Sequence, residues 1–230
     1  MKSSAENYLK LIFIHQTKEG TVKPNLLAKK LEVSTAAVTD MFKRLFEQGF
    51  IDYSKYKGAR LTPKGEAIGK TMVRRHRMWE MYLHKKLGFA WDKVHEEADR
   101  LEHASSDDLI DRLEEELQFP LFDPHGDPIP SKDGLIPTLQ TAQPLSTLKI
   151  GQSGKVIRVS DFDNQFLIYI NQLGVYLDQH ITLTQVRSFD QSCVVDINGT
   201  QASITQVVAD NIFVHPVIQR INHHVFRDST

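Results

Sequence analysis

Apolar residues in the first part of the chain recur at helical spacing, and short polar or glycine-containing turns separate the repeats. Residues 5–17 predict an amphipathic helix, and residues 26–33 and 34–50 predict two further helices joined by a tight turn. Ser34 is placed to cap the start of the second of these two, and Gly49 is placed to end it. The pattern therefore indicates a helix-turn-helix.

The next stretch, IDYSKYKGARLTPKG, changes from helical to alternating character. It predicts two short strands around a basic turn, followed by a long helix that Thr62 caps. A helix-turn-helix with a two-stranded wing is typical of DNA-binding domains, in which the second helix enters the major groove and the wing lies on phosphates. A small protein-interaction module is the alternative. The candidate DNA contacts on these elements are Lys23, Ser34, Thr35, Ala36, Thr39, Asp40, Lys43, Arg44, Lys55, Lys57 and Arg60.

Further along, residues 92–104 and 106–118 again show helical periodicity, and their apolar stripes suit burial against a second copy of the chain. After a Pro- and Gly-rich stretch, residues 145–228 alternate β-rich runs with polar turns, which favours a small SH3-like barrel. We therefore expect an α+β multidomain protein with a winged helix-turn-helix at 1–72, a helical dimerisation domain at 73–140 and an SH3-like domain at 141–230.

The net charge of −1 conceals an uneven distribution of charge along the chain. The first 72 residues carry 13 Lys and Arg against 7 Asp and Glu, and residues 73–140 carry 9 against 15. A basic N-terminal segment indicates a polyanionic partner such as DNA. The single cysteine excludes an internal disulfide, and no apolar run approaches a membrane span of roughly 18 residues. The start MKSSAENYLK has no signal-peptide core, so we expect a cytoplasmic protein without a membrane partner.

The stretch VHEEADRLEH carries the candidate chemistry. Its two imidazoles and two of its carboxylates share one face of a helix, and the preceding helix adds a His and a Glu at i, i+4. These six residues are His76, Glu80, His95, Asp99, Glu102 and His103. Two neighbouring helices of this kind can surround a metal ion, and ligands without a thiolate suit Mn²⁺, Fe²⁺ or Co²⁺. A solvated acidic face is the alternative.

The chain resembles the diphtheria-toxin-repressor-type metalloregulators, and most closely the manganese-dependent branch with an added SH3-like (FeoA-type) domain. The motifs NYLKLIF, VSTAAVTDMFKRL, RRHRMWE, HEEADRLEH and FPLFDPHGDPIP carry the resemblance in the family's order and spacing. It implies a primary metal site made of His76, Asp99, Glu102, His103 and Asn7, where relatives usually have Asp at position 7.

The resemblance also implies an ancillary metal site, which would use Glu80, Asp123 and His125. Asp161 of the barrel domain would close it, and Asp163 and Gln165 are rival ligands. His95 would serve this site or support its ligands.

These expectations define a Mn²⁺-activated repressor of metal-uptake genes that binds a palindromic double-stranded DNA operator as a homodimer. It would not be an enzyme and would take no small organic substrate. One alternative is a repressor of the same fold that responds to Fe²⁺. Two others are a divalent-metal hydrolase and a metal-independent winged-helix adaptor.

Overall fold

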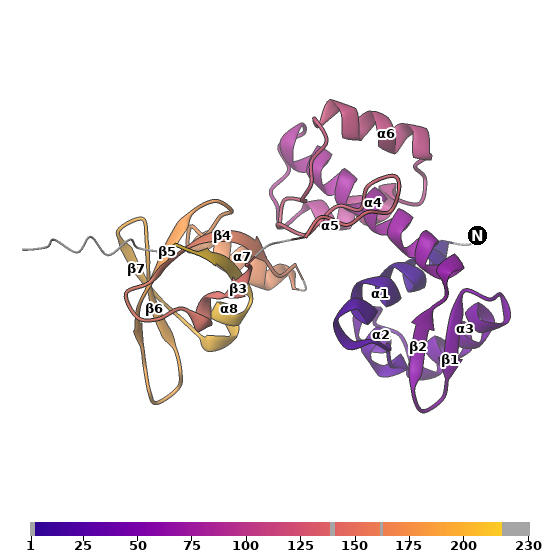
Figure 1. Cartoon of the computed structure of the whole chain (residues 1–230), viewed down its shortest axis with the longest axis horizontal. Coiled ribbons are helices and arrows are strands. Elements are labelled where there is room, and N and C mark those ends of the chain that lie inside the picture. The colour runs from indigo at the N-terminus through magenta and orange to yellow at the C-terminus, as the bar shows by residue number, and fades with distance from the viewer. Residues whose placement is uncertain (1–2, 139–140, 162, 218–230) are drawn as a thin grey trace, which may run out of the picture. The chain divides into compact units, whose positions relative to one another are not determined.

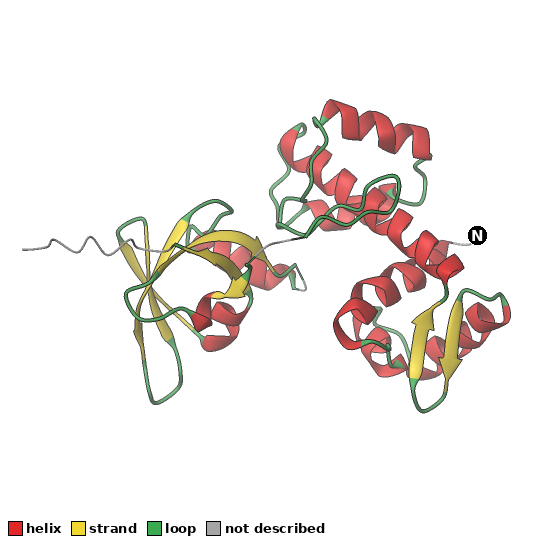
Figure 2. Ribbon diagram, viewed as in Figure 1, coloured by secondary structure: helices red, strands yellow, loops and turns green. Residues whose placement is uncertain are grey.

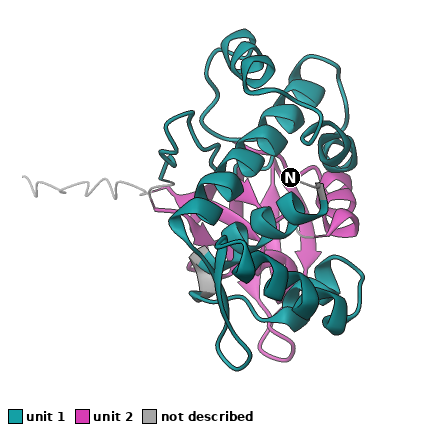
Figure 3. Ribbon diagram, turned by 90° about the vertical axis from the view of Figure 1, so that its right-hand side faces the viewer, with its two compact units in different colours: residues 1–138 teal, residues 139–230 magenta. Residues whose placement is uncertain are grey.

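The computed structural model describes residues 3–138, 141–161 and 163–217. The chain divides into two compact units, residues 1–138 and 139–230 (Figure 3). The first is mainly helical, and the second contains the larger sheet (Figure 2). Among the described residues, no helix is long and apolar enough to cross a membrane.

The first part of unit 1 is a winged helix-turn-helix, as the sequence predicts (Figure 1). Its elements are α1 (Ser3–Glu19), α2 (Pro24–Lys30), α3 (Thr35–Glu47), β1 (Ile51–Ser54) and β2 (Gly58–Leu61). The Ser34 hydroxyl accepts a hydrogen bond from the Ala37 N–H at 3.1 Å, which confirms the N-cap. Gly49 has φ +73° just after α3, and β1 and β2 pair antiparallel from Ile51 opposite Leu61.

One apolar core holds these elements together. Leu9 and Ile12 of α1, Leu27 of α2 and Phe42 of α3 are fully buried in it. Phe42 also meets Tyr8 edge-on, with ring centroids 6.4 Å apart. Because α1 shares this core with α3, the first helix is packed as part of the DNA-binding fold.

The rest of unit 1 is built around one long helix, α4 (Pro63–Lys85). The Thr62 hydroxyl caps its start, and Gly88 with φ +71° turns the chain after its end. α4 packs against α1 through one part of its length and against α5 (Val94–Leu101) and α6 (Asp107–Glu116) through the other (Figure 1). α4 therefore links the first helix to the later helices.

α1 packs closely on α4 at Gly69 of α4. A Cβ added there would lie 2.8 Å from Cβ of Phe13 and 3.0 Å from the carbonyl oxygen of Leu9. We expect Gly69→Ala to destabilise the protein by about 1–3 kcal/mol, the usual cost of overpacking, because α1 must shift outward. Urea unfolding followed by circular dichroism measures this. Ala67→Leu, which adds bulk on the exposed face of α4, is the control, and equal stability of the two variants would contradict the expectation.

Unit 2 contains one antiparallel six-stranded sheet with the order β3-β8-β4-β5-β6-β7. The elements are β3 (Gln143–Pro144), η1 (Leu145–Thr147), β4 (Ser153–Val159), α7 (Asn164–Gln172), β5 (His180–Val186), β6 (Cys193–Ile197), β7 (Thr200–Ile204), α8 (Gln206–Asp210) and β8 (Ile212–Pro216). The expected SH3-like sheet fold is confirmed. The sequence did not predict α7 or α8, because the alternation of β-rich runs and turns dominated the pattern.

Candidate metal centre and DNA-binding surface

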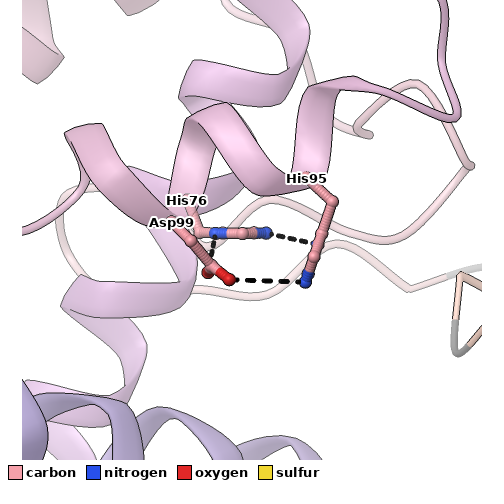
Figure 4. A group of neighbouring side chains, drawn as sticks. All are labelled: His76, His95 and Asp99. Carbon is pink, nitrogen blue, oxygen red and sulfur yellow. Dashed lines mark hydrogen bonds and ion pairs between the residues drawn. The ribbon is translucent and has the colours of Figure 1, made fainter. Parts of the chain in front are cut away.

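Three candidate ligands converge between α4 and α5. Figure 4 shows His76 from α4 facing His95 and Asp99 from α5. Nδ1 of His76 lies 3.3 Å from Oδ1 of Asp99, and Nε2 lies 3.0 Å from Nδ1 of His95. Potential ligand atoms of all three residues lie within 4.8 Å of one another. The two helices therefore supply one face of a possible metal site.

Glu102 and His103 follow α5 and extend the cluster toward α1. Glu102 is fully buried, and its Oε2 lies 2.6 Å from Nδ1 of His76. Nε2 of His103 lies 2.7 Å from Oδ1 of Asn7 and 3.3 Å from Oε1 of Glu102. All five residues expected at the primary site thus belong to one connected cluster.

Lys10 lies inside this cluster, and the sequence analysis missed it. Its Nζ is 2.8 Å from Oδ1 of Asp99 and 2.8 Å from both carboxylate oxygens of Glu102. Nδ1 of His76 is 3.4 Å away. Lys10 follows Asn7 by three residues, which places both on one face of α1. That spacing was the available signal.

Glu6 of α1 is a second residue that the sequence analysis missed. Its Oε2 lies 2.8 Å from Nδ1 of His103, on the ring edge opposite the contact with Asn7. A carboxylate that is hydrogen-bonded to one imidazole nitrogen fixes the orientation of the ring and makes the other nitrogen a stronger metal ligand. Glu6 therefore orients His103 toward Asn7 and the rest of the cluster.

Electrostatics in the cluster favour cations. Burial opposes charge on Lys10 and on His76, but Glu102 and Asp99 raise the pKa of Lys10, and Glu80 holds the pKa of His76 well above 6.5. Burial also opposes ionisation of Asp99, yet hydrogen bonding to His76 and the charge of Lys10 hold the pKa of Asp99 below its usual range. The ammonium of Lys10 marks where positive charge is stabilised, and the oxygen and imidazole donors around it fit a divalent metal ion.

A second cluster consists of Glu80, Asp123 and His125, which are all buried and have potential ligand atoms within 4.8 Å of one another. The Nε2–H of His125 donates a hydrogen bond to the carbonyl oxygen of Trp91 at 2.9 Å. In the neutral ring the lone pair that can bind a metal ion is therefore on Nδ1. Among the described residues, the buried Oε2 of Glu80 has no hydrogen-bond partner. Within the same part of the chain, Oδ2 of Asp123 has only the Arg77 guanidinium, at 3.3 Å. These carboxylate oxygens fit a second cation.

His95 lies beside Glu80, with Nδ1 at 3.2 Å from Oε1 of Glu80. It therefore stands between the two clusters. Asp161, Asp163 and Gln165 belong to unit 2, and Asp163 caps α7 by accepting from the Gln165 N–H at 2.8 Å. That Asp161 completes the ancillary metal site remains a prediction.

Burial, followed by the nearby charges of Asp127 and Glu80, raises the pKa of Asp123 to about 7. The folded state therefore binds a proton that the unfolded chain releases near pH 4. The stability from this proton is present below pH 4 and is lost as pH rises from about 4 to about 7, by at most about 1.4 kcal/mol per pH unit. We expect metal-free wild type to lose stability relative to Asp123→Asn across this window. Parallel unfolding curves at pH 5, 6 and 7 measure the difference, and a constant difference would contradict the assignment.

The candidate DNA contacts lie where the sequence analysis placed them on α2, α3 and the wing. All are exposed except Thr39, which is partly buried. The Thr39 hydroxyl donates to the carbonyl oxygen of Thr35, and Nζ of Lys43 lies 3.1 Å from Oδ1 of Asp40. Lys55 and Lys57 flank Tyr56 at the tip of the wing, where Tyr56 is 88% exposed. α3 and the wing thus form an exposed, largely basic surface.

Three family profiles match successive parts of the chain. Residues 1–59 match "Iron dependent repressor, N-terminal DNA binding domain", and residues 62–131 match "Iron dependent repressor, metal binding and dimerisation domain". Residues 143–216 match the FeoA domain.

Individual relatives agree with these profiles. The HTH-type transcriptional regulator MntR of Lysinibacillus sphaericus is 32% identical over 115 residues, which are 50% of this chain and 82% of that protein. The iron-dependent repressor IdeR of Mycobacterium leprae is 33% identical over 127 residues, 55% of each chain. A solved manganese-dependent transcriptional repressor in complex with manganese is 37% identical and has a TM-score of 0.85, over 93% of this chain and 100% of that one. This chain therefore belongs to the iron-dependent repressor family of metal-regulated, DNA-binding transcriptional regulators.

Proposed function

We propose that this protein is a Mn²⁺-activated repressor that binds palindromic operators of metal-uptake genes as a homodimer in the cytoplasm. The observation that carries the proposal is the cluster in which Asn7 of α1 meets His103 while His76 and Asp99 meet between α4 and α5. One site thereby contains residues of the DNA-binding fold and residues of the following helices. The solved manganese repressor and the MntR relatives support Mn²⁺, and the IdeR relative keeps Fe²⁺ as the alternative.

The donor atoms themselves are compatible with Mn²⁺. Mn²⁺ accepts carboxylate and amide oxygens together with imidazole nitrogens, and the five proposed primary residues offer these and no sulfur. When bound, the ion would supply two positive charges to a buried site that already attracts cations. His76, Asp99, Glu102, His103 and Asn7 would hold it, and Glu80, Asp123, His125 and Asp161 would hold a second one.

The regulatory consequence follows from where the residues are anchored. Asn7 moves with α1, and α1 shares its core with the recognition helix α3. His76 and Asp99 stand on α4 and α5. When these side chains bind the same metal ion, the ion fixes the orientation of the DNA-binding fold relative to α4. Two DNA-binding folds held in this way in a dimer can match two operator half-sites. By linkage, DNA must then raise metal affinity as much as metal raises DNA affinity.

The family consists of transcriptional regulators, so the hydrolase alternative and the metal-independent adaptor alternative are both wrong. Fluorescence anisotropy of a palindromic promoter fragment tests the remaining choice. We expect Mn²⁺ to raise DNA affinity by about 5–150-fold over the chelated protein, the usual range of allosteric coupling. Activation by Fe²⁺ at a lower free concentration than Mn²⁺, under anaerobic conditions, would favour the iron alternative. DNA affinity that ignores both metals would contradict the proposal.

A further inference from the structure

The ammonium of Lys10 contacts His76, Asp99 and Glu102, three of the five residues proposed for the primary site. The side chain is only 7% exposed, and Nζ has Asp99 Oδ1 and both Glu102 oxygens at 2.8 Å. A lysine this deeply buried requires anionic partners, and here the partners are two proposed metal ligands.

We propose that Lys10 is a tethered cation that competes with the metal ion for the primary site and thereby sets the metal concentration at which the protein responds. This inference rests on the proposed primary site. It adds a residue that is no metal ligand, because a charged ammonium has three N–H donors and no lone pair to offer a metal.

The competition follows from the shared oxygen atoms. The Glu102 carboxylate directs both oxygens at Nζ of Lys10, so neither oxygen is available to a metal ion at the same position. Asp99 and Glu102 together carry two negative charges, of which Lys10 already balances one. A divalent ion close to the ammonium is repelled by it, so Lys10 lowers metal affinity unless its side chain withdraws.

Lys10 also links two helices. It belongs to α1, whereas Asp99 lies in α5 and Glu102 directly follows α5. The ion pairs therefore join α1 to α5 across 89 and 92 positions of the sequence. Removing the ammonium would leave the buried Glu102 carboxylate with the imidazoles of His76 and His103 as its partners among the described residues, which would weaken the protein when no metal is bound.

Lys10→Met, which retains the apolar stem without the charge, tests the inference in the full chain. Electron paramagnetic resonance of free Mn²⁺ gives the affinity, and thermal unfolding in chelator and in Mn²⁺ gives the stability of each state. We expect about tenfold or greater tightening of Mn²⁺ binding, equivalent to about 1.4 kcal/mol, and a lower melting temperature of the metal-free protein. Lys29→Met on the exposed face of α2 is the control and should change neither value. Unchanged or weaker Mn²⁺ binding in Lys10→Met would overturn the inference.

A measurement on the wild type keeps the inference testable if Lys10→Met does not fold. Amine-reactive labelling followed by mass spectrometry should modify Lys10 slowly in chelator and faster in saturating Mn²⁺. An equal labelling rate of Lys10 in chelator and in Mn²⁺ would show that Mn²⁺ does not displace its side chain and would overturn the inference. If Asp99→Ala loses Mn²⁺ binding but Lys10 fails these tests, only the competition is wrong. If Asp99→Ala binds Mn²⁺ as the wild type does, the primary site itself is wrong.

Discussion

Asp99→Ala is expected to weaken Mn²⁺ binding by about a hundredfold or more, on the order of 2.7 kcal/mol, and to make DNA binding insensitive to Mn²⁺. The Asp99 side chain contributes a carboxylate to the face shared with His76, and it balances Lys10. It is also 46% exposed, so its removal leaves no cavity in the core. Isothermal titration with Mn²⁺, together with anisotropy on operator DNA, measures both effects.

Glu96→Ala is the matched control for this experiment. Glu96 is also an acidic residue of α5, but its side chain is exposed and lies outside the cluster of possible ligands. We expect Glu96→Ala to bind Mn²⁺ and DNA as the wild type does. If both variants lose Mn²⁺ binding to the same extent, the general acidity of α5 attracts the metal, and the specific role of Asp99 is wrong.

The second large effect concerns the recognition helix. Ala36→Glu is expected to weaken operator binding by about a hundredfold or more while Mn²⁺ affinity stays at the wild-type value. Ala36 is exposed in the first turn of α3, where a small side chain allows close approach to base edges. A glutamate there adds bulk and places negative charge near the DNA phosphates.

Ala90→Glu adds the same charge at an exposed position after α4 and serves as the control. It should retain wild-type DNA affinity when Mn²⁺ is present. Operator binding by Ala36→Glu that equals binding by Ala90→Glu would show that α3 does not enter the groove. Unfolding curves of both variants should coincide with that of the wild type, because neither position belongs to the core.

Much of this structure could be predicted because its signals are local. The caps at Ser34 and Thr62 are confirmed as the starts of α3 and α4, and the basic turn does form a wing. α7 was missed because its buried Leu167 and Ile170 belong to a short run of β-forming residues. Asp163 was considered as a ligand there, although Asp before a helix is also a common N-cap.

Less of the candidate site than of the fold could be predicted from the sequence. The His76–Glu80 pair of α4 and the His95–Asp99 pair of α5 were visible as helical spacing, since each pair lies within one helix. Glu102 and His103 directly follow α5. The spacing of Asn7 and Lys10 places both on one face of α1, but it does not reveal their partners. Those contacts depend on the packing of α1 against the later helices. In addition, lysines are mostly exposed in proteins, so the sequence predicts a surface position for Lys10. Its carboxylate partners, which explain why it is buried, become visible only in the structure.

Anomalous diffraction from a Mn²⁺-loaded crystal would test whether one metal ion joins α1 to α4 and α5. We expect a Mn²⁺ peak within ligand distance of Asn7, His76, Asp99, Glu102 and His103, with Nζ of Lys10 moved away from Glu102. A saturated crystal without a peak among these side chains would contradict it.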